Sequence, residues 1–124
     1  MLCRGIRGAI TVDSNTSQDI LAASRELLEE MVAANDVNRE DIAAALFTTT
    51  NDLDADFPAK AARAMGWNDA PLTCGNEIPV PGSLGRCLRI LLLINTEKRA
   101  DEIVHVYLKG ASVLRPDREY HPQG

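Results

Sequence analysis

The sequence predicts a single α/β domain (α+β in the looser sense), in which two main helices pack on a mixed β-sheet of about five strands. The length of 124 residues and a hydrophobic content of 45% suit one domain with an ordinary core. Apolar residues alternate in some segments, as in strands, and recur at helical spacing in others. These segments follow one another in the order β-α-β-α-β-β-β, which is typical of a domain with a mixed sheet.

The first strand is expected from Cys3 to Val12, because this segment is rich in Ile, Val and Thr and is loosened only by Gly5 and Gly8. Side chains alternate across a strand, so Arg7 falls on a face of small residues that leaves space beside it. Arg7 taken alone is equally compatible with an ordinary surface arginine.

A helix is expected to follow the first strand and to end near Asn35. The sequence Thr16-x-x-Asp19 resembles a capping box in which Asp replaces Glu, and it marks the start of this helix. The apolar positions of the helix form one stripe, which consists of Ile20, Leu21, Leu27, Leu28, Met31 and Val32.

A second strand is expected over Ile42–Thr49, where phenylalanine and threonine favour a strand although the alanines favour a helix. A second helix is expected over Pro58–Gly66, with the proline near its first position and the glycine at its end. This helix places Lys60 and Arg63 on one face. That face is either a solvated basic surface or an edge at which an anion docks.

Leu72–Cys74 is expected to form a short third strand, which a proline-containing loop joins to a fourth strand over Arg86–Ile94. The fourth strand is almost continuously apolar, the pattern of a strand covered on both faces. Arg89 points into one of these faces, where a guanidinium is costly unless an anion meets it. We expect a ligand to bring that anion. The alternative is an internal partner, Glu77, which would make a structural salt bridge.

The fifth strand is expected over Ile103–Leu108, and Ala111–Leu114 is expected to form a further strand after Gly110. His105, within the fifth strand, is best explained as an ordinary sheet histidine. We expect the domain to span residues 1–116 and residues 117–124 to form a flexible C-terminal tail.

The composition narrows the class of function. A net charge of −5 and a pI of about 4.9 argue against binding to the phosphate backbone of nucleic acids. Three cysteines without a CxxC pair predict reduced thiols in a cytoplasmic protein, rather than disulfides or a zinc site. We expect no signal peptide and no membrane partner, because no apolar run is long enough. The sequence lacks GxGxxG, P-loop, HExxH and GxSxG motifs, so we expect no metal and no cofactor.

With these motifs absent, the candidate functional residues are a set of side chains suited to binding a small anion. These groups are Arg7, Arg89 and Tyr107 on strands, Lys60, Arg63 and Arg115 outside them, and Cys74 and Glu77 near the end of a strand. Tyr107 could instead be a core residue with a hydrated hydroxyl. Cys74 could instead be a small buried hydrophobe.

Five segments occur in a characteristic order. They are Arg4-Gly5-Ile6-Arg7-Gly8-Ala9, Phe57-Pro58-Ala59-Lys60-Ala61, Pro71-Leu72-Thr73-Cys74 with Glu77, Cys87-Leu88-Arg89, and His105-Val106-Tyr107-Leu108. With them, nearly the whole chain resembles the monofunctional AroH-type chorismate mutases. The resemblance implies the Bacillus-type chorismate mutase fold and a homotrimer, a pseudo-barrel with active sites between subunits. It also implies the [3,3] Claisen rearrangement of chorismate to prephenate in the synthesis of phenylalanine and tyrosine.

By this resemblance, Arg89 would donate to the ether oxygen, Arg7 would pair with a substrate carboxylate, and Tyr107 would add a hydroxyl there. Glu77 and Cys74 would hold the ring hydroxyl. The other implied substrate-binding positions form a backbone wall and an entrance shared with the neighbouring subunit: Thr73, Gly75, Asn76, Phe57, Ala59, Lys60, Arg63, Leu114 and Arg115. Such a pericyclic reaction needs conformational restriction and electrostatic stabilisation, and no covalent catalysis. The alternative is a non-catalytic trimer that binds a small carboxylate and regulates another process.

Overall fold

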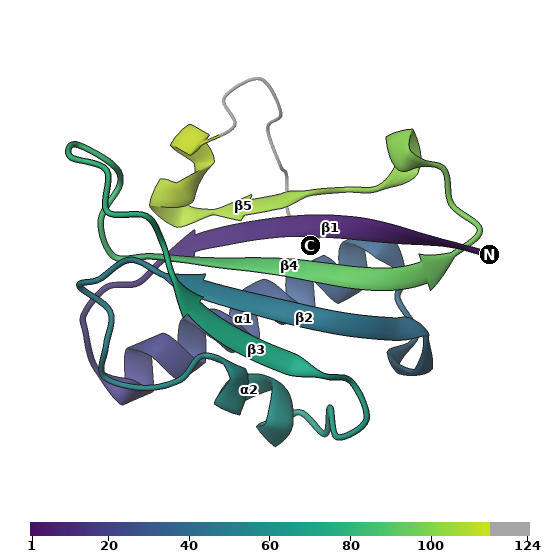
Figure 1. Cartoon of the computed structure of the whole chain (residues 1–124), viewed down its shortest axis with the longest axis horizontal. Coiled ribbons are helices and arrows are strands. Elements are labelled where there is room, and N and C mark those ends of the chain that lie inside the picture. The colour runs from purple at the N-terminus through teal and green to yellow at the C-terminus, as the bar shows by residue number, and fades with distance from the viewer. Residues whose placement is uncertain (115–124) are drawn as a thin grey trace.

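A five-stranded mixed sheet forms the centre of the computed structural model, which describes residues 1–114 (Figure 1). The strand order is β3-β2-β4-β1-β5. The strands are β1 (Leu2–Thr11), β2 (Ile42–Thr49), β3 (Leu72–Asn76), β4 (Cys87–Thr96) and β5 (Val106–Leu108). The central strand β4 pairs antiparallel with β1 and β2, whereas the outer pairs β1·β5 and β2·β3 are parallel. The predicted mixed sheet is confirmed.

Two helices, α1 (Ser17–Asn35) and α2 (Ala59–Ala64), accompany the sheet. The predicted start of α1 is confirmed, because the Thr16 hydroxyl accepts a hydrogen bond from the backbone N–H of Asp19 at 3.1 Å. The helix ends at Asp36, whose left-handed backbone closes the last turn. In the view of Figure 1, α1 lies behind the sheet, so the uncovered face of the sheet is turned toward the reader.

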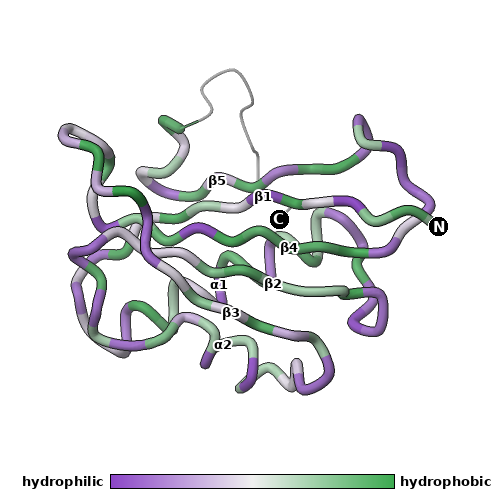
Figure 2. Tube along the Cα trace, viewed as in Figure 1, coloured by the Kyte–Doolittle hydropathy of each residue, from purple (hydrophilic) through white to green (hydrophobic). Residues whose placement is uncertain are grey.

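One face of the sheet builds the main core with the helices. Strands β2 and β4 are hydrophobic along most of their length (Figure 2), and alternate side chains of each point into this core. On β4 these are Leu88, Ile90, Leu92 and Ile94, each at most 2% exposed. They pack with the stripe of α1 that carries Leu27, Leu28 and Met31, all fully buried. This packing fixes the register of β4. Because side chains alternate along a strand, it also places Arg89 on the opposite face of the sheet.

Gly8 lies on the core face of β1, where α1 approaches the sheet closely. A Cβ atom at this position would lie 2.4 Å from the sulfur of Met31 and 3.1 Å from Cδ1 of Leu27. We expect Gly8→Ala to lower the free energy of unfolding by about 1–3 kcal/mol, measured by urea denaturation. Gly5→Ala is the matched control, because its Cβ would meet only Leu91 and Leu93, at 3.3 Å or more, on the other face. Equal losses in both variants would contradict this explanation.

The other face of the sheet is covered in part, where Ala9, Cys87 and Tyr107 are buried with Ala111, and is otherwise open within the described residues. Leu91 on β4 and Leu46 on β2 are each 37% exposed, and Leu93 is half-buried. The prediction that β4 is covered on both faces is therefore wrong at Leu91 and Leu93 within the single chain, whereas Cys87 on the same face is fully buried. A strand pattern reports that apolar residues are buried in the final assembly and does not say which chain buries them.

Several predicted boundaries also change, and the first and fourth strands and the second helix each shift by one or two residues at their ends. Strand β3 extends to Asn76, so Gly75 and Asn76 belong to the sheet and not to the loop. Strand β5 begins only at Val106. Ala111–Leu114 forms no strand and lies in the 3₁₀-helix η3 (Lys109–Leu114).

The chain leaves the sheet after β5 because Lys109 has a left-handed backbone, with φ of 52°, and turns away. Arg115 and the predicted flexible tail, residues 117–124, lie outside the described residues.

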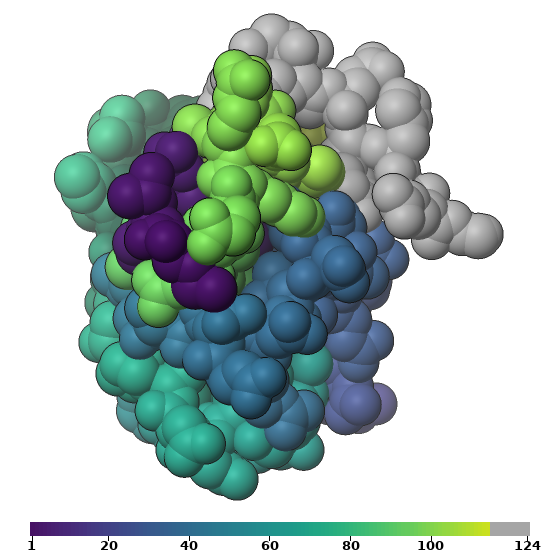
Figure 3. Space-filling model, turned by 90° about the vertical axis from the view of Figure 1, so that its right-hand side faces the viewer, coloured from purple at the N-terminus to yellow at the C-terminus, as the bar shows by residue number. Residues whose placement is uncertain are grey.

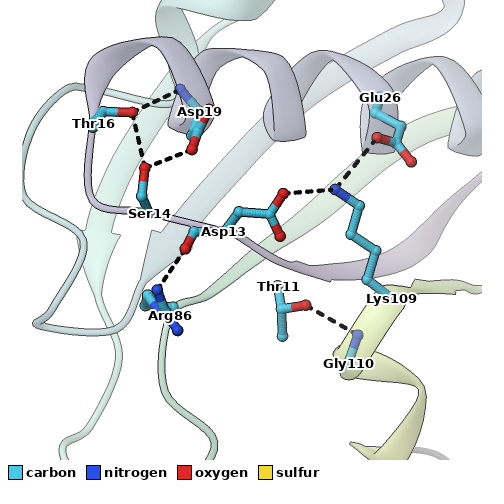
Figure 4. Close-up of polar contacts among 9 residues, drawn as sticks. All are labelled: Thr11, Asp13, Ser14, Thr16, Asp19, Glu26, Arg86, Lys109 and Gly110. Atoms are coloured by element: carbon cyan, nitrogen blue, oxygen red, sulfur yellow. Dashed lines mark hydrogen bonds and ion pairs between the residues drawn. The ribbon is translucent and has the colours of Figure 1, made fainter.

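Polar contacts fix the end of β1 to its neighbours (Figure 4). The backbone N–H of Gly110 donates to the hydroxyl of Thr11 at 3.0 Å, and the guanidinium of Arg86 donates to the carbonyl of Asp13. The ammonium of Lys109 lies 3.9 Å from the carboxylate of Asp13. Arg86 and Lys109 both have positive φ, a strained conformation for residues with side chains. These contacts therefore hold the two strained turns that begin β4 and end β5.

At the opposite end of the sheet, the first residues of the chain lie beside the segment near residue 100 (Figure 3). Arg4 Nε donates to the carbonyl of Lys98 at 3.2 Å, and the Lys98 ammonium donates to the carbonyl of Asn35 at 2.6 Å. The buried amide of Asn35 bonds the backbone of Val104 at 2.8 and 2.9 Å. Within residues 1–114, no helix is long and apolar enough to cross a membrane.

Candidate active site

Strand register assembles the site in the middle of the open face. Arg89 on β4 lies directly opposite Thr48 on β2 and Ala9 on β1. Thr48 in turn pairs with Gly75 on β3, and Ala9 pairs with Tyr107 on β5. The five residues therefore form one row across the sheet. Because paired residues share a face, the side chains of Arg89 and Tyr107 lie on the same face of the sheet, on either side of the small residue Ala9.

A pocket of about 370 Å³, the central pocket, opens above this row. Its lining includes Arg7, Thr48, Glu77, Arg89, Tyr107 and Leu114. Arg7 lies one row away, opposite Leu91 of β4, and its backbone N–H donates to Nδ1 of His105 at 2.9 Å. His105 precedes β5, so it is not the strand histidine that the sequence predicts. The structure thus brings together the four residues predicted to be catalytic, with Leu114.

Glu77 is the nearest anion to Arg89, with 3.5 Å between Oε1 of Glu77 and Nε of Arg89. Both side chains are partly exposed, at 24% and 31%. The expectation that a ligand alone supplies the counter-charge is therefore wrong, because the chain supplies part of it. The second oxygen of Glu77, Oε2, accepts a hydrogen bond from the hydroxyl of Thr48. Sequence reasoning missed Thr48, since only the register of β2 against β4 places it beside Arg89.

Two buried donors in the central pocket lack a partner. Nε of Arg89 and the hydroxyl oxygen of Tyr107 are buried, and neither forms a hydrogen bond within residues 1–114. Tyr107 is only 4% exposed, so its hydroxyl is not the hydrated group of the alternative interpretation. A buried polar group without a partner costs about 1–3 kcal/mol. Two such donors beside the cation of Arg7 suit a bound anion that accepts hydrogen bonds.

The thiol of Cys87 lies two residues before Arg89 on the same face of β4. Burial raises the pKa of this thiol, and the nearby positive charge of Arg89 offsets only part of that effect. Cys87 therefore stays neutral at physiological pH and gives Arg89 no counter-charge.

A second pocket, of about 350 Å³, lies at the β3 edge, and we name it the edge pocket. It is lined by Thr49, Asp54, Asp56, Phe57, Cys74, Gly75 and Asn76, among others. Cys74 pairs with Phe47, a fully buried core residue, so its side chain points to the helix side of the sheet. Within a single chain, Cys74 and Glu77 therefore line different pockets. Cys74 is exposed, so it is also not a buried hydrophobe.

The loop before α2 carries a well-held carboxylate, Asp56. The hydroxyl of Ser17, then the ammonium of Lys60, then the backbone N–H of Phe57 lower the pKa of Asp56 to about 2. Lys60 lies 2.9 Å from this carboxylate and is 53% exposed. Within the chain, Lys60 thus has an anionic partner already and is partly solvated.

The remaining predicted positions lie outside both pockets. Ala59 is buried in the main core at 2% exposure, so its side chain does not line a site here. Arg63 and Thr73 are exposed and line neither pocket. Among the residues that the structure describes, no group of three or more His, Cys, Asp and Glu side chains is arranged to hold a metal ion.

The sheet with its central pocket defines an α/β protein whose pocket is lined by groups suited to a small anion. Residues 3–118 match the model of the family described as chorismate mutase type I. The chain belongs to this family, which confirms the predicted family and the predicted enzyme class, an isomerase of the chorismate mutase type. The isomerase class does not by itself assign roles to individual side chains.

Relatives agree over nearly the full length. A chorismate mutase AroH from Thermus thermophilus is 50% identical over 119 residues, covering 95% of this chain and 98% of its own. The chorismate mutase AroH of Bacillus subtilis is 44% identical over 118 residues, covering 94% of this chain and 93% of its own. The structure of a chorismate mutase from Clostridium thermocellum superposes with a TM-score of 0.87 at 51% identity, covering 88% of this chain and 97% of that one.

Proposed function

We propose that this chain converts chorismate to prephenate in the central pocket, and that the edge pocket of a neighbouring subunit completes the site in a homotrimer. The observation that carries the proposal is a pair of buried donors in one row of the sheet, Nε of Arg89 and the hydroxyl of Tyr107, that form no hydrogen bond within residues 1–114. They lie in the same pocket as the cation of Arg7. Chorismate is a dianion, so it can satisfy these donors.

The rearrangement breaks a C–O bond while a C–C bond forms, and negative charge grows on the ether oxygen. A fixed donor that meets this charge lowers the barrier, because it needs no reorganisation during the reaction. We assign this role to Arg89. Arg7 pairs with a substrate carboxylate, and Tyr107 adds its hydroxyl to the carboxylate site. Holding the side chain of chorismate over its ring supplies the second contribution, conformational restriction.

The placement of the two pockets supports a site shared between subunits, and the number of three subunits comes from the resemblance to the family. The edge pocket lies along the outer strand β3, and the central pocket lies over β4 and its neighbours with a different lining. We take them as two halves of one site that meet between subunits. The open face also presents the apolar side chains of Leu46 and Leu91, which suits burial against another subunit. In a closed ring, the central pocket of each subunit faces the edge pocket of the next. Phe57 and Cys74 then reach the substrate from the neighbour, and Lys60, paired with Asp56, lies at the entrance.

The direct test is a turnover assay with the purified protein, in which the absorbance of chorismate is followed over time. We expect loss of chorismate and formation of prephenate at a rate far above that of the uncatalysed reaction. Tight binding of chorismate without turnover would overturn the proposal and favour the regulatory carboxylate-binding protein. We assign the reaction to the cytoplasm, because the free thiols of Cys3, Cys74 and Cys87 suit a reducing compartment.

A shared site makes a prediction for thiol reactivity. Cys3 and Cys74 are exposed, and Cys87 is buried. In Cys3→Ser protein, we expect saturating prephenate to slow the reaction of Cys74 with a thiol reagent severalfold, because ligand would cover the edge pocket. The control is Cys74→Ser protein, in which prephenate should leave the reaction of Cys3 unchanged. Equal rates for Cys74 with and without prephenate would remove the edge pocket from the site.

A further inference from the structure

We propose that Thr48 is a positioning residue that acts through Glu77 and keeps Nε of Arg89 available to the substrate. This inference rests on the proposed role of Arg89 in the rearrangement. Thr48 does not need to touch the substrate for this role, because its hydroxyl already donates to Oε2 of Glu77.

The backbone leaves Glu77 few ways to place its carboxylate. The Glu77 N–H donates to the carbonyl of Thr49 at 2.9 Å and so extends the pairing of β3 with β2 by one residue. Thr48 lies opposite Arg89 on one side and opposite Gly75 on the other. The space beside Gly75 is open, because a Cβ built there would have no neighbour within 4 Å among the described residues, its chain neighbours aside. With the backbone of Glu77 held in this way, the position of its carboxylate depends mainly on the rotation of its side chain.

Two partners compete for the Glu77 carboxylate. An arginine and a carboxylate side by side prefer two parallel hydrogen bonds of about 2.7–2.9 Å. Here Oε1 of Glu77 lies 3.5 Å from Nε of Arg89, beyond that range, and Nε forms no hydrogen bond within residues 1–114. The hydroxyl of Thr48 holds the other oxygen. Thr48 therefore prevents Glu77 from closing onto Arg89 as a full ion pair.

The Glu77 carboxylate, held by Thr48, affects Arg89 in two ways. It stays close enough to offset part of the cost of burying the Arg89 cation. It lies near the Nε donor without a hydrogen bond to it within residues 1–114, so this donor can turn to the oxygen that gains charge in the transition state. Removing the Thr48 hydroxyl should let Glu77 take that donor, so the loss should fall on kcat more than on KM.

The experiment compares Thr48→Val and Thr48→Ser, each in wild-type and Glu77→Gln backgrounds. We expect Thr48→Val to lower kcat by about tenfold or more with a smaller change in KM, because the lost bond involves a charged group. Thr48→Ser keeps the hydroxyl and should restore kcat to within about threefold of wild type. In Glu77→Gln protein, Thr48→Val should change kcat by less than about twofold, because neighbouring residues that act together are not additive. Thr96→Val, near the far end of β4, is the matched control.

A spectroscopic readout separates this role from a merely structural one. The NMR resonance of the Arg89 Nε–H, identified by its loss in Arg89→Lys protein, should shift and exchange more slowly with water in Thr48→Val protein. Wild-type kcat and an unmoved resonance in Thr48→Val would overturn the inference. An equal loss in the Glu77→Gln background would also overturn it. Full turnover in Arg89→Lys protein would overturn the proposed role of Arg89 itself. Loss of turnover in Arg89→Lys together with wild-type kcat in Thr48→Val would overturn only the role of Thr48, so the two failures are distinguishable.

Discussion

Replacing Arg89 with lysine is expected to lower the kcat for chorismate by about 100-fold to 1,000-fold, since one such donor contributes about 3 kcal/mol to the barrier. Lysine keeps the positive charge but not the planar fork of donors. Its ammonium cannot place a hydrogen at the position of the buried Nε, which lacks a partner within residues 1–114. The loss would therefore report donor geometry more than charge. Steady-state kinetics with chorismate measure it.

The matched control for this variant is Arg25→Lys. Arg25 lies on α1, where its guanidinium pairs with Glu29 at 2.6 Å in an exposed position. Exposed ion pairs contribute little, so turnover and thermal stability should both stay close to wild type. A melting temperature for Arg89→Lys near that of wild type would show that the loss of activity is not a loss of fold. Turnover near wild type in Arg89→Lys protein would remove Arg89 from the mechanism.

Much of the fold could be predicted because local rules determine it. The Thr16 hydroxyl caps α1 as the capping pattern indicates, and the alternation along β4 places Leu88, Ile90 and Leu92 in the core. The same alternation puts Arg89 on the opposite face, beside the residues predicted with it. Period-two patterns and caps depend on neighbours in sequence, and for that reason a sequence reveals them.

The rest could not be predicted, because it depends on which strands become neighbours. The chain order of β3 and β4 does not reveal that β2 lies between them and brings Thr48 to Glu77. Nor does it reveal that Cys74 faces away from Arg89, because that follows from the pairing of Cys74 with Phe47. Ala111–Leu114 has the composition of a strand, but the turn at Lys109 carries it away from the sheet edge.

A mixture of two inactive variants is expected to regain activity. Arg89→Lys impairs the central pocket, and Phe57→Asp places a carboxylate in the edge pocket, where it repels the dianionic substrate. Phe57 is 63% exposed in the chain, so this change should not disturb the core. We expect each variant alone to lose about 100-fold in turnover. After the two are unfolded and refolded together in equal amounts, about a quarter of wild-type activity should return, because subunits of a ring combine at random.

The size of the recovery follows from which pockets meet. If each site joins the central pocket of one subunit to the edge pocket of the next, one site in about four escapes both substitutions in a random ring. If instead each chain contained a complete site, every site would carry one substitution and no activity would return. Phe57→Leu refolded with Arg89→Lys controls for the size of the side chain, since it adds no charge. The mixing experiment therefore tests the shared site independently of the chemistry assigned to Arg89, and a mixture as inactive as its components would place the whole reaction on one subunit.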